Sequence, residues 1–299
     1  MKDRILFMLT KYGSRRSKRQ KKKFKSYIKN YASNINKDVS IQPYKIDRII
    51  VENIIIGELN TSKYIFVAPY DTGEKMLNSQ HKRYINQFEL NRQMILKNRL
   101  IYILIGFFIS FVSLYLIYTS FSQKNWLRII MLMFGVISLI IGVITSRGYS
   151  SKYNVSQTIP VTFLLDMLEK MDGSYAVVLL DNTETLDLGL ATLLENNDLK
   201  NKYIIRIGNM GYGSQFVALT TIKNSLLEKL KKNLSLLEIE MITNNFLQQN
   251  CKEYIHLNWC EKDEQGYYIP YYATPKDHMI HSENIEEMFK VVNLIQQKI

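Results

Sequence analysis

The chain is poor in cysteine and proline. Its 299 residues include five prolines and two cysteines, Cys251 and Cys260. Two cysteines cannot build a disulfide framework, and their spacing matches neither a zinc knuckle nor a redox pair. We therefore expect both to be reduced thiols of a domain that faces the cytosol.

A secretory signal peptide is also missing. The apolar stretch Ile5–Leu9 is too short for one, and the segment Lys11–Lys25 is rich in cations where a cleavage site would be expected. Acidic residues are in deficit, with 27 Asp and Glu against 39 Lys and Arg, which gives a formal net charge of +12. The length leaves room for one soluble domain of ordinary size.

Charge is absent from two long apolar runs. Leu100–Phe121 and Ile129–Thr145 hold no charged residue, and the first would reach about 33 Å as a helix. A hydrocarbon core is about 30 Å thick. Two buried helices of a soluble domain are the disfavoured alternative, because such runs are rare in globular cores. We predict a transmembrane hairpin with spans at about residues 100–121 and 127–145.

The cations around these runs predict an orientation. Seven flank the hairpin and two lie in or next to its short loop; the flanking set is Lys82, Arg83, Arg92, Lys97, Arg99, Arg147 and Lys152, and the loop set is Lys124 and Arg128. The positive-inside rule then places both flanks in the cytoplasm. We expect a discontinuous soluble domain, residues 1–81 and 148–299, interrupted by a helix and the hairpin over residues 82–147.

A basic segment lies near the N-terminus. The apolar positions Phe24, Ile28 and Tyr31 predict an amphipathic helix, and its cations include Arg15, Arg16, Lys18, Arg19, Lys21, Lys22 and Lys23. Such a cluster favours contact with anionic lipid at the bilayer surface. A solvated helix face is the simpler alternative, and nucleic acid is the less favoured partner.

The remaining pattern alternates strands with helices. It predicts strands at Ile46–Leu59, Tyr64–Ala68, Tyr175–Leu180 and Tyr203–Ile207, and helices at Lys82–Asn98, Val161–Met171, Asp187–Glu195, Leu226–Gln249 and Asn284–Gln297. This order is typical of an α/β domain with a mainly parallel, mixed sheet. Function in such sheets usually sits at the carboxyl ends of strands. Here those ends are the turns at Pro69, Asp181 and Gly208.

Five segments resemble, in order, the motifs of one enzyme family. They are Tyr12–Arg16, similar to Gly-Pro-Arg; Glu52–Leu59, similar to Asn-Val-Ile-Gly; Phe66–Thr72, similar to Val-x-Ala-His-Tyr-Asp-Thr; Leu180–Glu184, similar to Phe-Asp-Gly-Glu-Glu; and Tyr272–Asp277, similar to Tyr-His-Thr-Pro-x-Asp. These motifs belong to the co-catalytic di-zinc aminopeptidases, which include aminopeptidase Y and the transferrin-receptor ectodomain. The resemblance implies a three-layer zinc-exopeptidase-like α/β domain.

The departures from these motifs remove most metal ligands that the resemblance implies. Pro69 replaces the first zinc histidine, Thr183 the general-base glutamate and Ala273 the last histidine. The bridging aspartate falls near Ser156, and a further acidic ligand falls at Gly208 or Asn209. Glu184 keeps the place of a ligating glutamate. Asp71, which orients the first histidine in the family, is expected to have nothing to orient. One remaining ligand cannot hold two zinc ions.

Two ways in which the chain could still bind a catalytic metal are weaker alternatives. A relocated one-metal site could use Glu184 with His278 or His281, although such histidines are more often solvated surface residues. The one-zinc glutaminyl cyclase variant of the fold needs the same bridging aspartate and final histidine, so it fails at the same positions. We therefore expect no catalytic residue, no metal and no cofactor.

The sequence thus predicts a membrane-anchored, catalytically inactive peptidase-like protein. It would act as a binding subunit or regulator of a membrane complex, with peptide export or maturation as candidate settings. The alternatives are an active metallo-hydrolase with a rebuilt site near Glu184 and a lipid-binding module that acts through the basic helix. Small residues of the two spans, Gly106, Gly135 and Gly142, fit equally well against partner helices or against each other.

Overall fold

The computed structural model describes residues 2–122, 126–151, 154–170, 175–184, 186–221, 227, 231 and 237–297. Lys124 and Lys152, used in the orientation prediction, and much of Leu226–Gln249 lie outside the described residues. In chain order the elements are α1 (Lys2–Tyr12), α2 (Lys18–Asn34), β1 (Val39–Ile46), β2 (Ile49–Ile56), β3 (Tyr64–Pro69), β4 (Lys82–Tyr84), α3 (Phe88–Ser120), α4 (Trp126–Ser146), α5 (Val155–Leu168), β5 (Tyr175–Leu180), α6 (Leu188–Asn196), β6 (Tyr203–Ile207), β7 (Gln215–Thr220), β8 (Leu237–Met241), α8 (Asn245–Asn250), β9 (Glu253–Asp263), β10 (Gly266–Pro270) and α9 (Ser282–Gln297).

The strands form one mixed sheet in the order β1-β2-β5-β3-β6-β9-β10-β4, with β7 paired to β9 and β8. Its centre is parallel, because β5, β3, β6 and β9 run the same way. The expected mainly parallel sheet is wrong, since five of the nine pairings between described strands are antiparallel. Two of these pairings, β1–β2 and β9–β10, are hairpins, and a hairpin reverses the chain direction by construction. The other three, β2–β5, β7–β9 and β4–β10, join strands that other elements separate in the chain.

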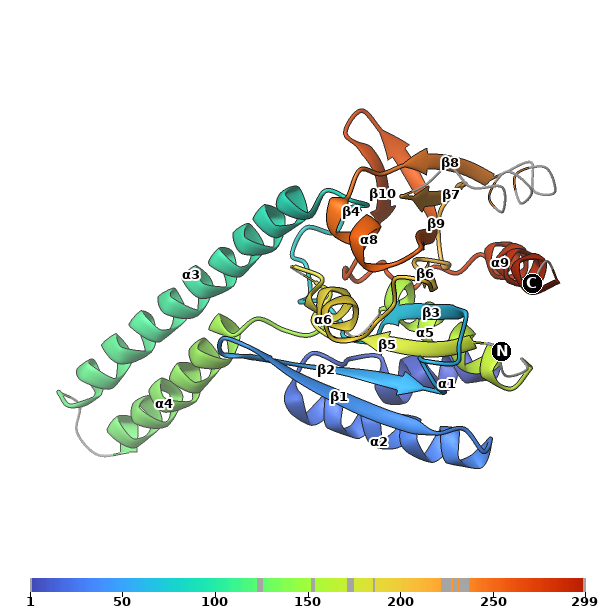
Figure 1. Cartoon of the computed structure of the whole chain (residues 1–299). Coiled ribbons are helices and arrows are strands. Elements are labelled where there is room, and N and C mark those ends of the chain that lie inside the picture. The colour runs from blue at the N-terminus through green and yellow to red at the C-terminus, as the bar shows by residue number, and fades with distance from the viewer. Residues whose placement is uncertain are drawn as a thin grey trace.

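Helices cover both faces of the sheet (Figure 1). Side chains alternate along the central strands, so Phe66 and Ala68 of β3 face one core while Ile65 and Val67 face the other. The first core also contains side chains of α1, α2, α5 and α9. The second contains side chains of α6 and α8. The result is the three-layer α/β architecture that the sequence predicted.

Helices α3 and α4 lie side by side and project away from the sheet (Figure 1). Both are long and apolar enough to be candidate membrane spans, and only 17% and 11% of their most apolar windows are buried. Their small residues pack the two helices together. A Cβ on Gly106 would lie 2.6 Å from the Gly142 carbonyl oxygen, and Ser113 Oγ donates to Ser138 Oγ at 2.8 Å. The sequence left open whether these small residues pack against partner helices or against each other. In the structure they pack α3 against α4.

The base of the hairpin is fastened to the domain around one buried carboxylate. Glu74 Oε2 accepts from Arg16 at 2.6 Å and from Arg99 of α3 at 2.9 Å. Glu74 also forms an isolated bridge with Ser150, just beyond α4. A carboxylate shared by two guanidiniums ties the N-terminal segment to both ends of the hairpin.

Two predicted helices are wrong in part. Lys82–Asn98 begins with strand β4, because Lys82–Tyr84 pairs with Tyr268–Pro270 of β10, and its helix starts only at Phe88. The described part of Leu226–Gln249 contains strand β8, which pairs with β7, and the short helix α8. Sheet partners distant in sequence override the local helical pattern in both places.

Candidate functional site

The ends of β3, β5 and β6 meet at one cavity of about 240 Å³. Pro69, Thr183, Gly208 and Asn209 line it, together with Ser156 from α5. Two of the three strand ends named from the sequence, at Pro69 and Gly208, therefore line this cavity, and Thr183 lines it from the turn that Asp181 begins. Parallel strands place their carboxyl ends at the same sheet edge, which explains why turns so distant in sequence come together.

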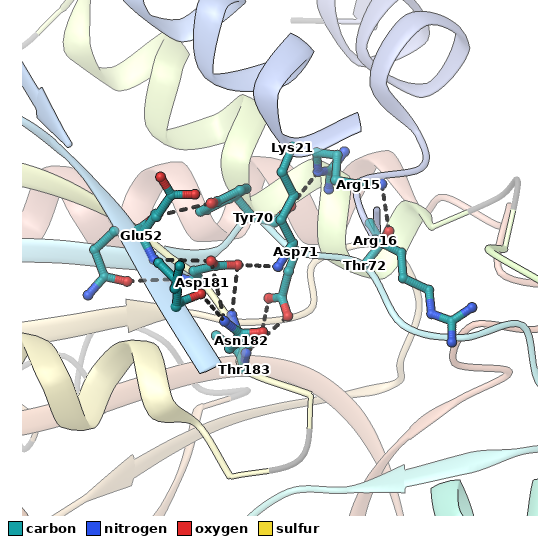
Figure 2. A network of polar contacts seen from close by, with 12 residues as sticks. Arg15, Arg16, Lys21, Glu52, Tyr70, Asp71, Thr72, Asp181, Asn182 and Thr183 are labelled. Carbon is teal, nitrogen blue, oxygen red and sulfur yellow. Dashed lines mark hydrogen bonds and ion pairs between the residues drawn. The ribbon is translucent and has the colours of Figure 1, made fainter. Parts of the chain in front are cut away.

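Asp71 lies behind this cavity and binds Thr183. Its carboxylate accepts from the Thr183 amide at 3.0 Å and from the Thr183 hydroxyl at 2.7 Å (Figure 2). Burial, and then the nearby Glu184 charge, raise the pKa of Asp71 to about 7. The expectation that Asp71 orients nothing is wrong, because it fixes the turn that follows β5.

Asp181 holds the base of the same turn rather than lining the cavity. Its carboxylate pairs with Lys21 of α2 and accepts from the Glu52 amide at 3.1 Å (Figure 2). Arg15 is fully buried and donates through Nε to the Tyr70 carbonyl at 2.5 Å. These contacts dock the N-terminal segment onto the ends of β3 and β5.

Glu184 sits in a compact polar cluster. One of its carboxylate oxygens accepts from Arg83 of β4 at 2.9 Å, and also from Gln157 and Tyr272. Arg83 donates further to the Thr183 carbonyl at 3.1 Å, and its guanidinium lies over the Tyr272 ring. Burial disfavours the Arg83 charge, but Tyr272 and Glu184 outweigh it and hold the pKa of Arg83 above its ordinary value. A guanidinium thus neutralises this carboxylate.

Ser156 and Ala273 share a different carboxylate. Asp277 accepts from the Ser156 hydroxyl at 2.7 Å, from the Ser156 amide at 3.0 Å and from the Ala273 amide at 3.1 Å. Burial raises the pKa of Asp277 to about 6, against these hydrogen bonds. These hydrogen bonds fix Ser156, which lines the cavity, to the segment that carries Ala273 and Asp277.

Asn209 stabilises the glycine-rich turn after β6. Its amide nitrogen donates to the carbonyls of Tyr212 and Trp259 at 2.6 and 2.7 Å, and its amide oxygen accepts from Gly211 at 3.1 Å. The preceding Gly208 has no room for a side chain, because a Cβ there would lie 1.8 Å from Asn258 Oδ1. This pattern of contacts is that of a structural turn.

The donor set does not fit the zinc centre that the resemblance implies. Within the described ranges, no three His, Cys, Asp or Glu side chains lie together in a way that could hold a metal ion. His278 and His281 are exposed and do not line the cavity. Glu184, which keeps the position of a zinc-ligating glutamate, is instead paired with Arg83. A zinc ion would have to displace that cation.

The basic N-terminal cations divide into two groups. Arg15 is buried, Arg16 binds Glu74, and Lys21 binds Asp181. These three face the interior, so the prediction that Arg15 contacts a membrane surface is wrong. Others on α2 are exposed, namely Lys18, Arg19, Lys22, Lys23 and Lys29. The amphipathic helix is confirmed, with Phe24 and Ile28 buried on its inner face.

The sequence analysis did not predict a role in the site for several residues. Arg83, Gln157 and Tyr272 hold Glu184, and Arg206 pairs with Asp187 at the cavity wall. Tyr272 could have been found, because it begins the Tyr-Ala-Thr-Pro segment. Arg83 gives no local signal, since it reaches the site only through the pairing of β4 with β10.

Comparisons with known proteins identify the fold. No family profile matches the sequence, and no curated protein matches it. Among solved structures, glutaminyl cyclase of Porphyromonas gingivalis matches with a TM-score of 0.61 and 11% identity over 99% of this chain and 96% of its own. Glutaminyl cyclase of Tannerella forsythia gives 0.57 and 11% over 98% and 96%. A leucine aminopeptidase precursor of Bacteroides thetaiotaomicron gives 0.55 and 12% over 97% and 94%. The chain therefore shares the α/β fold of the glutaminyl cyclases and of a leucine aminopeptidase.

Proposed function

We propose that the chain is a membrane-anchored binding protein that uses an exopeptidase-like fold without the metal chemistry of its structural neighbours. The observation that carries this proposal is the state of Glu184. Its carboxylate is neutralised by Arg83 and bonded to Gln157 and Tyr272. A carboxylate in that setting has neither the free charge nor the neighbouring ligands that bind zinc.

The other catalytic positions support the same conclusion. Pro69 and Ala273 carry no metal-binding group, and the Thr183 hydroxyl donates a hydrogen bond to Asp71. A threonine hydroxyl does not take a proton from water near neutral pH. The cavity at the strand ends persists nevertheless, so the site retains a capacity to bind.

Anchoring supports a role beside a membrane partner. The two candidate spans lie between the element that carries Arg83 and the helix that carries Gln157, so the hairpin departs from the rim of the site. We propose that it is an insertion in the soluble domain and that the protein serves as a subunit or regulator of a membrane complex. Export or maturation of peptides is a setting in which a peptidase-like fold would be reused.

Elemental analysis of the detergent-purified full-length protein tests this function, with Glu184→Gln measured in parallel. We expect close to zero zinc in both samples, and no turnover of leucyl amides or of glutaminyl peptides. About one zinc per chain, lost in Glu184→Gln, would instead establish the alternative of a rebuilt metallo-hydrolase. Activity without zinc that responds to Glu184→Gln would also overturn the proposal.

A further inference from the structure

The polar end of the cavity contains two guanidiniums from different strands. Arg83 of β4 pairs with Glu184, and Arg206 of β6 pairs with Asp187. Both arginines line the cavity. A guanidinium has five N–H donors, more than the described contacts of Arg206 with Asp187 and Tyr254 occupy. Arg206 can therefore donate to a ligand without giving up its partner.

His256 of β9 lines the cavity beside these cations and is only partly buried. Burial, then Arg206 and then Arg83, lower the pKa of His256 well below its usual range. Two cations therefore lie near the imidazole, Arg83 and Arg206, each paired with its own carboxylate. An anionic group placed here would accept from the guanidiniums and would raise the pKa of His256 from this low position.

Part of the cavity wall is apolar. Leu186 and Leu190 contribute from one side, and Phe88, Ile242, Phe246 and Leu247 complete this part of the lining. The volume of about 240 Å³ lies below the range of about 300–1,000 Å³ that holds drug-sized ligands. The occupant must be small, with an apolar body and a polar end.

We propose that this cavity binds a small apolar monocarboxylate, with the carboxylate at Arg206, Arg83 and His256 and the apolar body against Leu186 and Phe246. The inference rests on the proposed non-catalytic function, because an active enzyme would turn its occupant over. A single negative charge fits best. Each arginine already has an acidic partner, and one imidazole can supply one compensating proton. A dianion would leave a charge uncompensated in a buried site.

Two sources share this chemistry, a free carboxylic acid and the C-terminal residue of a peptide. Titration calorimetry on the full-length protein in detergent distinguishes them with N-acetyl-leucine and with the tetrapeptide Gly-Gly-Gly-Leu. N-acetyl-leucinamide is the matched neutral probe. We expect at least one acid to bind about tenfold more tightly than the amide.

Variants locate the binding in this cavity. Leu186→Trp fills the mouth from an exposed position and should weaken binding by about tenfold or more. Ile280→Trp is the control, because Ile280 is also exposed but does not line the cavity. Arg206→Lys keeps the charge beside Asp187 but loses the fork of donors, so it should weaken the acid more than the amide.

The binding results test the ligand assignment, and the zinc and turnover results test the proposed function. Equal affinity for acid and amide, no binding of either acid, or unchanged binding in Leu186→Trp would overturn the ligand assignment. If zinc and turnover are absent at the same time, the non-catalytic function survives that result. Hydrolysis of a leucyl amide by the same sample would overturn both.

Discussion

Asp71 and Thr183 form one hydrogen-bonded unit at the turn after β5. The carboxylate receives both the amide and the hydroxyl of Thr183, so its role is to fix a turn. Burial and the charge of Glu184 make its ionised form costly. Folding therefore favours the protonated form of this carboxyl group.

We predict that Asp71 makes stability depend on pH. Its pKa is about 7 in the folded chain against 3.8 as the ordinary value, so between these values the folded state binds more protons than the unfolded state. The free energy of unfolding should then fall as pH rises from about 4 to about 7. Asp71→Asn should flatten this slope in melting temperatures measured across that range.

The control for this measurement is Asp198→Asn, at an exposed carboxyl, which should leave the slope unchanged. Part of the slope should survive in Asp71→Asn, because burial also raises the pKa of Asp277 to about 6 and of Glu253 to about 7. A slope identical to that of the unaltered chain would show that Asp71 is already ionised throughout.

Helices α3 and α4 form an element whose internal contacts can be tested directly. Ser113 and Ser138 lie with their hydroxyl oxygens 2.8 Å apart, so Ser113→Cys with Ser138→Cys should form a disulfide on mild oxidation in membranes. Gly106→Leu should abolish it, because even a Cβ there would lie 2.6 Å from the Gly142 carbonyl oxygen. Gel mobility with and without reductant measures the cross-link.

An outward-facing residue is the matched control for the hairpin. Leu104 is exposed on α3, so Leu104→Ile should leave the cross-link intact. Cross-linking that persists in Gly106→Leu would mean that α3 and α4 do not meet through their small residues.

Strands whose own residues show a clear apolar pattern were predictable from the sequence. Strands and contacts that depend on partners far away in the chain were not. The apolar strands β3, β5 and β6 and the turns after them could be read from the sequence, because each is buried on both faces. Strand β4 has three residues, two of them charged, and exists only through β10. The Arg83–Glu184 contact spans a separation of 101 residues. No local periodicity encodes such a contact.

For the whole molecule, the cation distribution predicts that both termini and the domain lie in the cytoplasm. Ser17 and Ser122 are exposed and lie on opposite sides in this arrangement. A membrane-impermeant maleimide should label Ser122→Cys but not Ser17→Cys in intact cells, and the reverse in inside-out vesicles. Labelling of Ser17→Cys in intact cells would invert the topology.

The exposed cations of α2 predict contact between the domain and anionic lipid. In nanodiscs that contain the full chain, a fluorophore on Ser26→Cys should be quenched by brominated lipid when anionic lipid is present. High salt, or Lys22→Glu with Lys23→Glu, should relieve that quenching because the attraction is screened or reversed. Quenching that ignores both changes would assign this helix to solvent or to another partner.

One consequence follows from the continuity of α3. This single helix of 33 residues begins with Phe88 and Asn91 in the cavity wall and continues through the candidate span. In a chain anchored as we propose, bilayer thickness sets the tilt of that helix through hydrophobic mismatch. Tilt would displace the wall residues, so cavity occupancy and lipid composition become thermodynamically linked. The cavity could then report on the membrane as well as on its ligand, and binding measured in thin and thick bilayers would differ.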